Sequence, residues 1–490
     1  MLLTLNASPA APGSRTVCYA QKSTLTDFST LARLDAIAQA DLCARGEVTP
    51  SELWQHCGRR IEALNPLLRA VTETTKERPA SKPGLLRAVP FLMKDASPWP
   101  GMRWTLGARL FAHRVTHQQT EYGRRLEEAG LVCTGKTALS EFGLLASTEG
   151  LLSGATLNPW DLSRSPMGSS GGSAVAVAAG MVPLAHANDG GGSIRAPASA
   201  CGVFGFKPSR GRHVVASRSS TDFADMTSEH CVSRSVRDSA LFLSLTEDRT
   251  RGDAVGFVRE PLARSLRIAA WTSTLAGEEP TSTVLRAHHD VVRLLSELGH
   301  VVEPISAPRF ETLGLAEACY LVAGAAVAGL VESIDRTRRE PVQQDELEPF
   351  TWALLDALRA RGSAAMPDAR DMFARTIAAY REATQPFDVV LTPTLASEPV
   401  PLGHLSPVLS RELLIERTAR VLGYTPIHNL VGCPAMSVPL SWSESGLPLG
   451  AHFAAAPGQD ALLLGLAYQL ESARPWRERW PRYSIPQLSG

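Results

Sequence analysis

Gly168-Ser-Ser-Gly-Gly-Ser-Ala174 is followed, after a short apolar run, by Asp189-Gly-Gly-Gly-Ser-Ile-Arg195. Both segments combine serine hydroxyls with glycines, whose backbone can approach a ligand closely. Small apolar residues at 174–179 predict a buried helix after the first segment, and residues 182–187 predict a strand before the second. Backbone amides and hydroxyls gathered in this way are typical of a binding or catalytic site.

A third segment adds a base to these serines. Lys94, one of only six lysines in the chain, ends a short apolar strand in Pro90-Phe-Leu-Met-Lys-Asp95. Burial lowers the pKa of a lysine and can leave its amine neutral, and a serine nucleophile needs such a base. Lys94 alone is more typical of a surface or ion-paired lysine, and a glycine run alone of a turn. Their joint occurrence with Ser169 and Ser193 predicts nucleophilic catalysis.

Two other motifs compete for the chemistry. Gly130-Leu-Val-Cys-Thr-Gly-Lys-Thr137 matches the phosphate-binding loop G-x-x-x-x-G-K-[ST]. A charged helix precedes Gly130 and the residues between the glycines resemble a strand, so we predict a helix–strand turn without nucleotide. Gly168–Gly172 also satisfies G-x-S-x-G around Ser170, the nucleophile elbow of α/β-hydrolases. Residues 158–166 form a predicted loop instead of the strand that an elbow needs, which argues against Ser170 as nucleophile.

Composition excludes several classes of protein. The chain has 490 residues with 49 basic and 49 acidic side chains, and this balance argues against a nucleic-acid partner. Eight scattered cysteines without a C-x-x-C pair are typical of reduced thiols in a cytoplasmic protein. No secretory signal is visible, and the apolar stretch 313–331 contains Glu317, so we predict a buried helix there and no membrane span.

Alternating strands and helices predict an α/β fold around one mixed sheet. Residues 1–30 lack periodicity and are interpreted as an N-terminal extension. Thr49-Pro-Ser-Glu52 is a capping box that opens a helix, which Asn65-Pro66 is predicted to close. Residues 312–385 are predicted to be largely helical.

These segments, together with Cys201-Gly-Val-Phe-Gly-Phe-Lys-Pro208, resemble the amidase signature family over roughly residues 31–476. The resemblance implies a single large α/β domain at 31–480, with a twisted mixed sheet covered by helices on both faces. It places the signature core at about 90–210 and a helical substrate-pocket region at about 312–385. Within the family, residues 184–189 and 470–476 look most like the 6-aminohexanoate cyclic-dimer hydrolases.

The resemblance also implies a mechanism, which is hydrolysis of an amide C–N bond by a Ser–cis-Ser–Lys triad through an acyl-enzyme. Ser193 would attack the carbonyl, Ser169, held through a cis peptide bond, would relay the proton, and neutral Lys94 would accept it. The resemblance also implies an oxyanion hole formed by the backbone N–H groups of Gly190, Gly191, Gly192 and Ser193. Ser170 would support the network by hydrogen bonding, and Asp189 and Arg195 would fix the glycine loop. Asn188 departs from the family, where threonine is usual. No metal or organic cofactor is implied.

The partners follow from the same resemblance. We expect a small-molecule amide substrate, no nucleic acid or membrane, a cytoplasmic location, and an assembly that can be a homodimer. The alternative function is amide transfer, because the A subunit of glutamyl-tRNA amidotransferase shares this signature. In that enzyme the released ammonia passes to a second active site, which requires a partner subunit. A scaffold without activity is disfavoured because Lys94, Ser169 and Ser193 are all present.

Overall fold

The structure, a computed structural model, describes residues 28–76, 82–214, 222–308 and 311–488. The predicted N-terminal extension, residues 1–30, lies outside the described residues except for 28–30, which belong to helix α1 (Phe28–Ala32).

One mixed sheet is the centre of the described chain. Its eleven strands follow the order β1-β5-β2-β8-β10-β9-β14-β15-β13-β11-β12. Pairs of β2 with β5 and β8, and of β11 with β12 and β13, are parallel, whereas every pair from β8 to β13 is antiparallel. The predicted mixed sheet is confirmed. The strands are β1 (Val71–Thr74), β2 (Pro90–Lys94), β5 (Val132–Thr137), β8 (Leu184–Asp189), β9 (Phe204–Lys207), β10 (Ser228–Ser233), β11 (Arg267–Ala270), β12 (Val301–Pro304), β13 (Val389–Pro393), β14 (Ala435–Trp442) and β15 (Pro448–Ala455).

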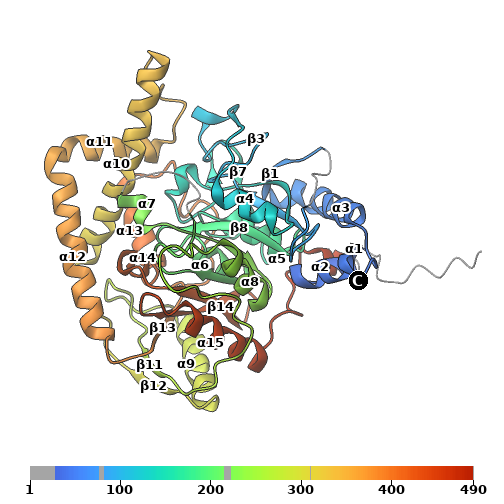
Figure 1. Cartoon of the computed structure of the whole chain (residues 1–490). Coiled ribbons are helices and arrows are strands. Elements are labelled where there is room, and N and C mark those ends of the chain that lie inside the picture. The colour runs from blue at the N-terminus through green and yellow to red at the C-terminus, as the bar shows by residue number, and fades with distance from the viewer. Residues whose placement is uncertain (1–27, 77–81, 215–221, 309–310, 489–490) are drawn as a thin grey trace, which may run out of the picture.

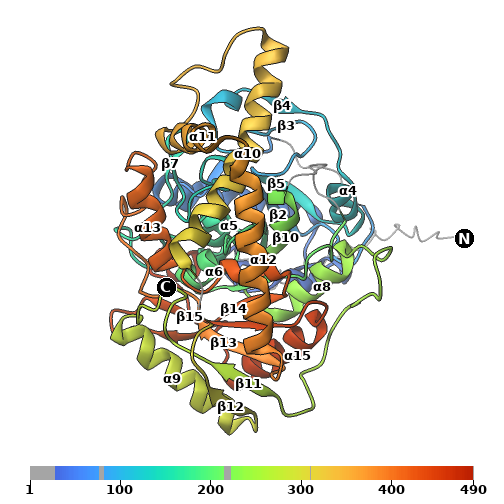
Figure 2. The ribbon, with the colours of Figure 1, turned by 90° about the vertical axis from the view of Figure 1, so that its left-hand side faces the viewer.

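Helices cover both faces of this sheet (Figures 1 and 2). Successive side chains of a strand point to opposite faces, and β2 shows the consequence. Leu92 packs in one core with helices α3 and α5, whereas Phe91 packs in another with α2, α4 and α8. These helices are α2 (Ala36–Ala44), α3 (Pro50–Leu68), α4 (Glu121–Glu128), α5 (Gly171–Ala178) and α8 (Val236–Thr246).

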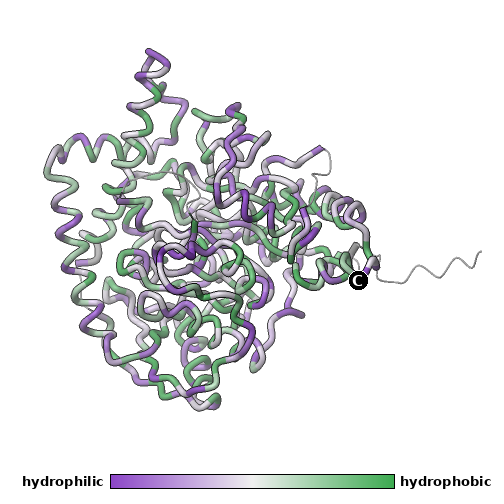
Figure 3. The backbone as a smooth tube through the Cα atoms, in the orientation of Figure 1, coloured by the Kyte–Doolittle hydropathy of each residue, from purple (hydrophilic) through white to green (hydrophobic). Residues whose placement is uncertain are grey.

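Three long helices form a further layer along one side of the molecule (Figures 1 and 2). They are α10 (Thr312–Arg338), α11 (Pro349–Arg361) and α12 (Ala365–Thr384), so the predicted helical region is confirmed. Hydrophilic and hydrophobic positions alternate along α12 (Figure 3), whose buried residues include Ala369 and Tyr380. This alternation lets one face of α12 pack against α10 while the other contacts solvent.

Among the described residues, helix α10 is long and apolar enough over Gly314–Arg338 to cross a membrane, by length and composition alone. In the structure it packs against α11, α12 and α13 (Arg411–Val421). Glu317 of α10 forms an ion pair with Arg411 of α13. One face of α10 therefore belongs to the protein interior, in line with the buried helix that the sequence predicts.

One helix boundary in the prediction is wrong. Helix α3 passes through Asn65-Pro66 and continues to Leu68, where Arg69 adopts a left-handed backbone conformation. A proline in the last turn removes only one helical hydrogen bond. Asn65 offsets this loss because its side-chain oxygen accepts a hydrogen bond from the Ala70 N–H at 2.9 Å.

The remaining elements complete the described fold. They are helices α6 (Arg195–Cys201), α7 (Asp222–Met226), α9 (Ser282–Glu297), α14 (Pro426–Val431), α15 (Asp460–Ala473) and α16 (Ile485–Leu488), the ribbons β3 (Met102–Arg103) with β4 (Val115–Thr116) and β6 (Glu149–Gly150) with β7 (Gly154–Ala155), and the 3-10 turns η2 (Arg109–Phe111), η3 (Glu141–Gly143) and η4 (Gly362–Ala364).

Candidate active site

Lys94 stands at the carboxyl end of β2, and its side chain is fully buried. Its Nζ contacts three oxygens, Ser169 Oγ at 2.8 Å, Ser170 Oγ at 2.8 Å and Asn188 Oδ1 at 2.5 Å. The serines belong to the loop before α5, and Asn188 belongs to β8, which lies beside β2. The fold therefore brings the predicted base within hydrogen-bonding distance of both predicted serines of the first segment.

Burial also changes the chemistry of this amine. Removal from water lowers the pKa of Lys94 to about 7, because it disfavours the charged ammonium. The negative charges of Glu229 and Asp189 raise the pKa and limit this shift. A substantial fraction of Lys94 is therefore neutral near pH 7 and can accept a proton.

The loop that carries Ser169 is anchored at both ends by one hydroxyl. Thr148 Oγ1 donates to the carbonyl of Met167 at 2.9 Å and accepts from the N–H of Gly171 at 3.1 Å. The Gly168–Ser169 peptide bond between these anchors is cis, as the family resemblance implies. These contacts fix the direction in which the Ser169 side chain leaves the backbone.

Asp189 and Arg195 form a fully buried ion pair beneath the glycine loop, with Nε–Oδ2 and Nη2–Oδ1 distances of 2.9 Å. Asp189 also accepts hydrogen bonds from the N–H groups of Gly192 at 2.7 Å and Ile194 at 3.1 Å. Burial would raise the pKa of Asp189, but the charge and hydrogen bonds of Arg195 outweigh it and hold this pKa below its ordinary value. Asp189 is therefore ionised, and its hydrogen bonds to the Gly192 and Ile194 N–H groups hold the loop in place.

Ser193 follows this loop at the start of α6 and is only partly buried. Within the described part of the chain, we find no acceptor for the N–H groups of Gly190, Gly191 and Ser193, so these amides are available to a ligand. The amide of Gly192 differs because it already donates to Asp189 at 2.7 Å. The structure thus argues against the predicted place of Gly192 among the oxyanion donors.

A cavity opens beside Ser169 and Ser193. It is bounded by the segment after η3, by α7, by α10 and by the end of α13. The side chains on these walls are mostly apolar, for example Leu144, Met226 and Leu422. The Ser193 hydroxyl and the backbone of Gly190 and Gly191 therefore line one part of a mostly apolar cavity.

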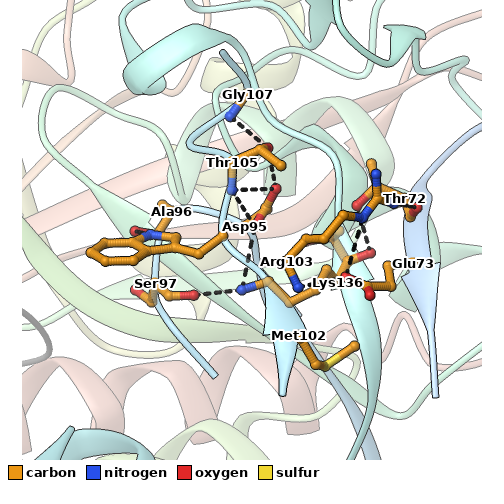
Figure 4. A network of polar contacts seen from close by, with 12 residues as sticks. Thr72, Glu73, Asp95, Ala96, Ser97, Met102, Arg103, Thr105, Gly107 and Lys136 are labelled. Carbon is orange, nitrogen blue, oxygen red and sulfur yellow. Dashed lines mark hydrogen bonds and ion pairs between the residues drawn. The ribbon is translucent and has the colours of Figure 1, made fainter. Parts of the chain in front are cut away.

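Lys136, the lysine of the phosphate-loop match, binds protein groups (Figure 4). Its buried Nζ donates to the carbonyl of Ser97 at 2.5 Å and lies 3.4 Å from Asp95 Oδ1. Asp95 accepts in turn from the N–H of Thr105 at 3.2 Å. Strand β5 contains Lys136, and Gly130 follows α4 with a φ of 91°, so the predicted helix–strand turn is confirmed.

Two parts of the site were not predicted from the sequence. Asn188 contacts the Lys94 amine, and its only signal was that it stands where the family usually has threonine. Thr425, just before α14, donates to the carbonyl of Gly191 at 2.8 Å, and Asn429 of α14 donates to Asp189 Oδ1 at 3.0 Å. Neither residue of the α14 segment carries a local signal, because the contact exists only in the folded chain.

Known proteins resemble this chain over most of its length. Residues 58–464 match the family model described as Amidase. The chain belongs to the amidase family. This amidase is therefore an amide hydrolase, with the single large α/β fold of structurally known members. Within its described residues, no group of three or more His, Cys, Asp or Glu side chains is placed to hold a metal ion.

Three relatives illustrate the match. "Putative amidase AmiC" of Mycobacterium leprae (strain TN) is 36% identical over 466 residues, covering 91% of this chain and 96% of that protein. The 6-aminohexanoate-cyclic-dimer hydrolase of Pseudomonas sp. (strain NK87) is 32% identical over 485 residues, covering 92% and 97%. A solved 6-aminohexanoate cyclic dimer hydrolase complexed with substrate has a TM-score of 0.85 at 29% identity, covering 92% and 99%. The finer resemblance of the sequence to the cyclic-dimer hydrolases is thus matched by relatives of that name.

Proposed function

We propose that this amidase cleaves its amide through an acyl-enzyme, with Ser193 as nucleophile, Ser169 as proton relay and Lys94 as base. The observation that carries the proposal is the 2.8 Å contact between Lys94 Nζ and Ser169 Oγ beside the cavity that Ser193 lines. A neutral amine, a relay hydroxyl and a more accessible serine are the groups that nucleophilic attack on a carbonyl requires.

The hydrogen bonds around Lys94 support this order of proton transfer. A neutral amine has two N–H groups and one lone pair, and the oxygen Asn188 Oδ1 can only accept, so it takes one N–H. The Ser170 hydroxyl donates to the backbone carbonyl of Asn188 at 3.2 Å and therefore accepts the second N–H. The lone pair of Lys94 is left for the Ser169 hydroxyl, which makes Ser169 the relay and Ser170 a supporting group.

Each step conserves atoms and charge. The Ser193 Oγ–H gives its proton to Ser169 Oγ while Ser169 gives its own proton to Lys94, and Ser193 Oγ bonds to the carbonyl carbon. The proton returns along the same path to the nitrogen of the leaving group, and the C–N bond breaks to release an amine or ammonia. Water, activated by the same relay, cleaves the acyl–Ser193 ester and releases a carboxylic acid.

The negative oxygen of the tetrahedral intermediate needs donors that are already in place. We assign this role to the backbone N–H groups of Gly190, Gly191 and Ser193, which have no other acceptor in the described residues. Gly192 is left out because Asp189 uses its N–H. Asp189 and Arg195 act indirectly, by holding the loop in the shape that exposes the other amides.

A direct test uses the purified chain in the presence of EDTA and a panel of activated anilides. The proposal expects hydrolysis, with an acyl group found by mass spectrometry on the peptide that contains Ser193 after a short reaction. Turnover that appears only with a second polypeptide and glutamine would favour the alternative, amide transfer. Turnover that requires ATP would point to the Lys136 segment as a nucleotide site.

We further propose that the enzyme works in the cytoplasm. Seven cysteines of the described residues are free thiols, and six of them are buried, which suits a reducing compartment. The test is to purify the protein from cytoplasm and to measure its activity and its intact mass. An active protein with the mass of the fully reduced chain would support this location, and a disulfide in the native protein would contradict it.

A further inference from the structure

The described residues that line the cavity beside Ser193 are uncharged. None of the residues that line it in the described part of the chain is Asp, Glu, Lys, Arg or His. Its walls are made by apolar side chains such as Leu315 and Ala323 of α10, Met226 of α7 and Leu422 at the end of α13. A substrate group that enters this space therefore meets no charged side chain among the described lining residues.

Three charged residues of α10 and α13 that stand close in sequence to lining residues are bound to other groups. Glu317 follows a lining residue of α10, yet it is paired with Arg411 of α13. Arg417, which precedes the lining residue Thr418, donates to the carbonyl of His404 at 2.9 Å. Arg420 pairs with a glutamate on its own helix at 3.0 Å. Charge is thus available on both helices but is kept out of the cavity.

The polar side chains that these two helices present to the cavity are neutral. They are the hydroxyl groups of Tyr320 on α10 and Thr418 on α13. A hydroxyl can donate to or accept from an amide or ether group but cannot balance an ionised carboxylate or ammonium. Burying a charge without a partner costs far more than burying an apolar group, so charged substrates should be rejected.

We infer that the cavity selects substrates whose buried part is uncharged, that is, alkyl or aryl groups with neutral polar atoms at most. This inference rests on the proposed function, since it assumes that Ser193 is the reacting group. It excludes glutamine, whose ammonium and carboxylate would both enter close to the reacting carbonyl. It also distinguishes this site from one built to hold amino acids.

Labelling rates test the selectivity without a known substrate. The probes are three alkyl fluorophosphonates of equal length that end in a methyl group, a carboxylate or an ammonium group, and the readout is the rate of Ser193 modification. We expect the methyl-ended probe to react at least about 100-fold faster than either charged probe. Rates that agree within about threefold, or a faster charged probe, would overturn the inference. If no probe modifies Ser193, it is the proposed function that fails.

A matched pair of variants locates the selectivity in the cavity. Met226 lines the wall, and its side chain has nearly the length of lysine, so Met226→Lys adds a cation with little change in volume. We expect this variant to raise the rate of the carboxylate probe relative to the methyl probe by at least about tenfold, whereas Met226→Leu should keep the wild-type ratio. An unchanged ratio in a folded Met226→Lys would contradict the assignment to this cavity, and if that variant does not fold, the wild-type rates decide alone.

Discussion

Lys94 Nζ lies 2.8 Å from Ser169 Oγ, although the two residues are separated by 75 positions in the chain. The contact exists because β2 and β8 are neighbours in the sheet, and the Ser169 loop leads through α5 into β8. Full burial then gives the Lys94 amine a pKa of about 7. The short distance and the lowered pKa of Lys94 therefore both favour proton transfer from Ser169 to Lys94.

The first prediction concerns pH. Lys94 must be unprotonated to act as base, so kcat/KM should rise with pH through a limb near pH 7. The charge of Glu229 raises the pKa of Lys94, so Glu229→Gln should move this limb to lower pH. The exposed Glu478→Gln is the control and should leave the limb in place. A limb that moves to higher pH in Glu229→Gln would contradict the electrostatic assignment.

Replacement of the base gives the second prediction. Lys94→Arg replaces an amine with a pKa of about 7 by a guanidinium, which stays protonated and cannot accept the proton of Ser169. We expect kcat to fall by about a thousandfold or more, measured on any amide that the wild type hydrolyses. Lys82→Arg, at an exposed lysine, should be fully active. Substantial turnover by Lys94→Arg would make Lys94 a structural residue.

The third prediction concerns the ion pair below the glycine loop. Asp189→Asn leaves Arg195 buried without its counter-charge, so the free energy of unfolding should fall by about 3–5 kcal/mol. Activity should fall as well, because the loop amides lose their organising carboxylate. Urea unfolding followed by circular dichroism measures the first effect. Asp356→Asn, at the exposed pair with Arg359, should change stability little, and an equal loss in both variants would refute the special role of Asp189.

The fourth prediction concerns Lys136. Lys136→Met leaves the Asp95 carboxylate buried without its positively charged partner, so we expect a loss of about 3–5 kcal/mol in the free energy of unfolding. The double variant Lys136→Met with Asp95→Asn removes both charges and should recover part of this loss. Calorimetric titration should show no ATP binding to the wild type. Saturable ATP binding that Lys136→Met abolishes would restore the phosphate-loop interpretation.

The sequence predicts the centre of this site better than its surroundings. Lys94 and the two serine segments carry local signals, an apolar strand end and glycine runs, that specify their chemistry before folding. Other residues act only through contacts between segments that are distant in the sequence, namely Asn188, Thr425 and Asn429. Nothing in the local sequence distinguishes them from other polar residues. Gly192 differs from the other predicted oxyanion donors because its N–H donates to Asp189, and nothing in a glycine run shows which N–H will do so.

The same distinction holds for the fold. Apolar runs such as β2 and β8 have a strand pattern that the sequence shows, whereas β10 has the polar sequence Ser-Glu-His-Cys-Val-Ser and shows none. It is a central strand because it pairs along its whole length with β8. Tertiary pairing therefore decides its conformation more than the propensity of its own residues.

Covalent labelling of the reacting serine shows whether Ser193 is the nucleophile. A fluorophosphonate reacts with the activated nucleophile and leaves a mass that peptide sequencing assigns to one residue. We predict that the label is found on Ser193 in the wild type, that Ser193→Ala is not labelled, and that Ser170→Ala is still labelled on Ser193 at a lower rate. A label on Ser170 in the wild type, or full labelling of Ser193→Ala, would contradict this assignment.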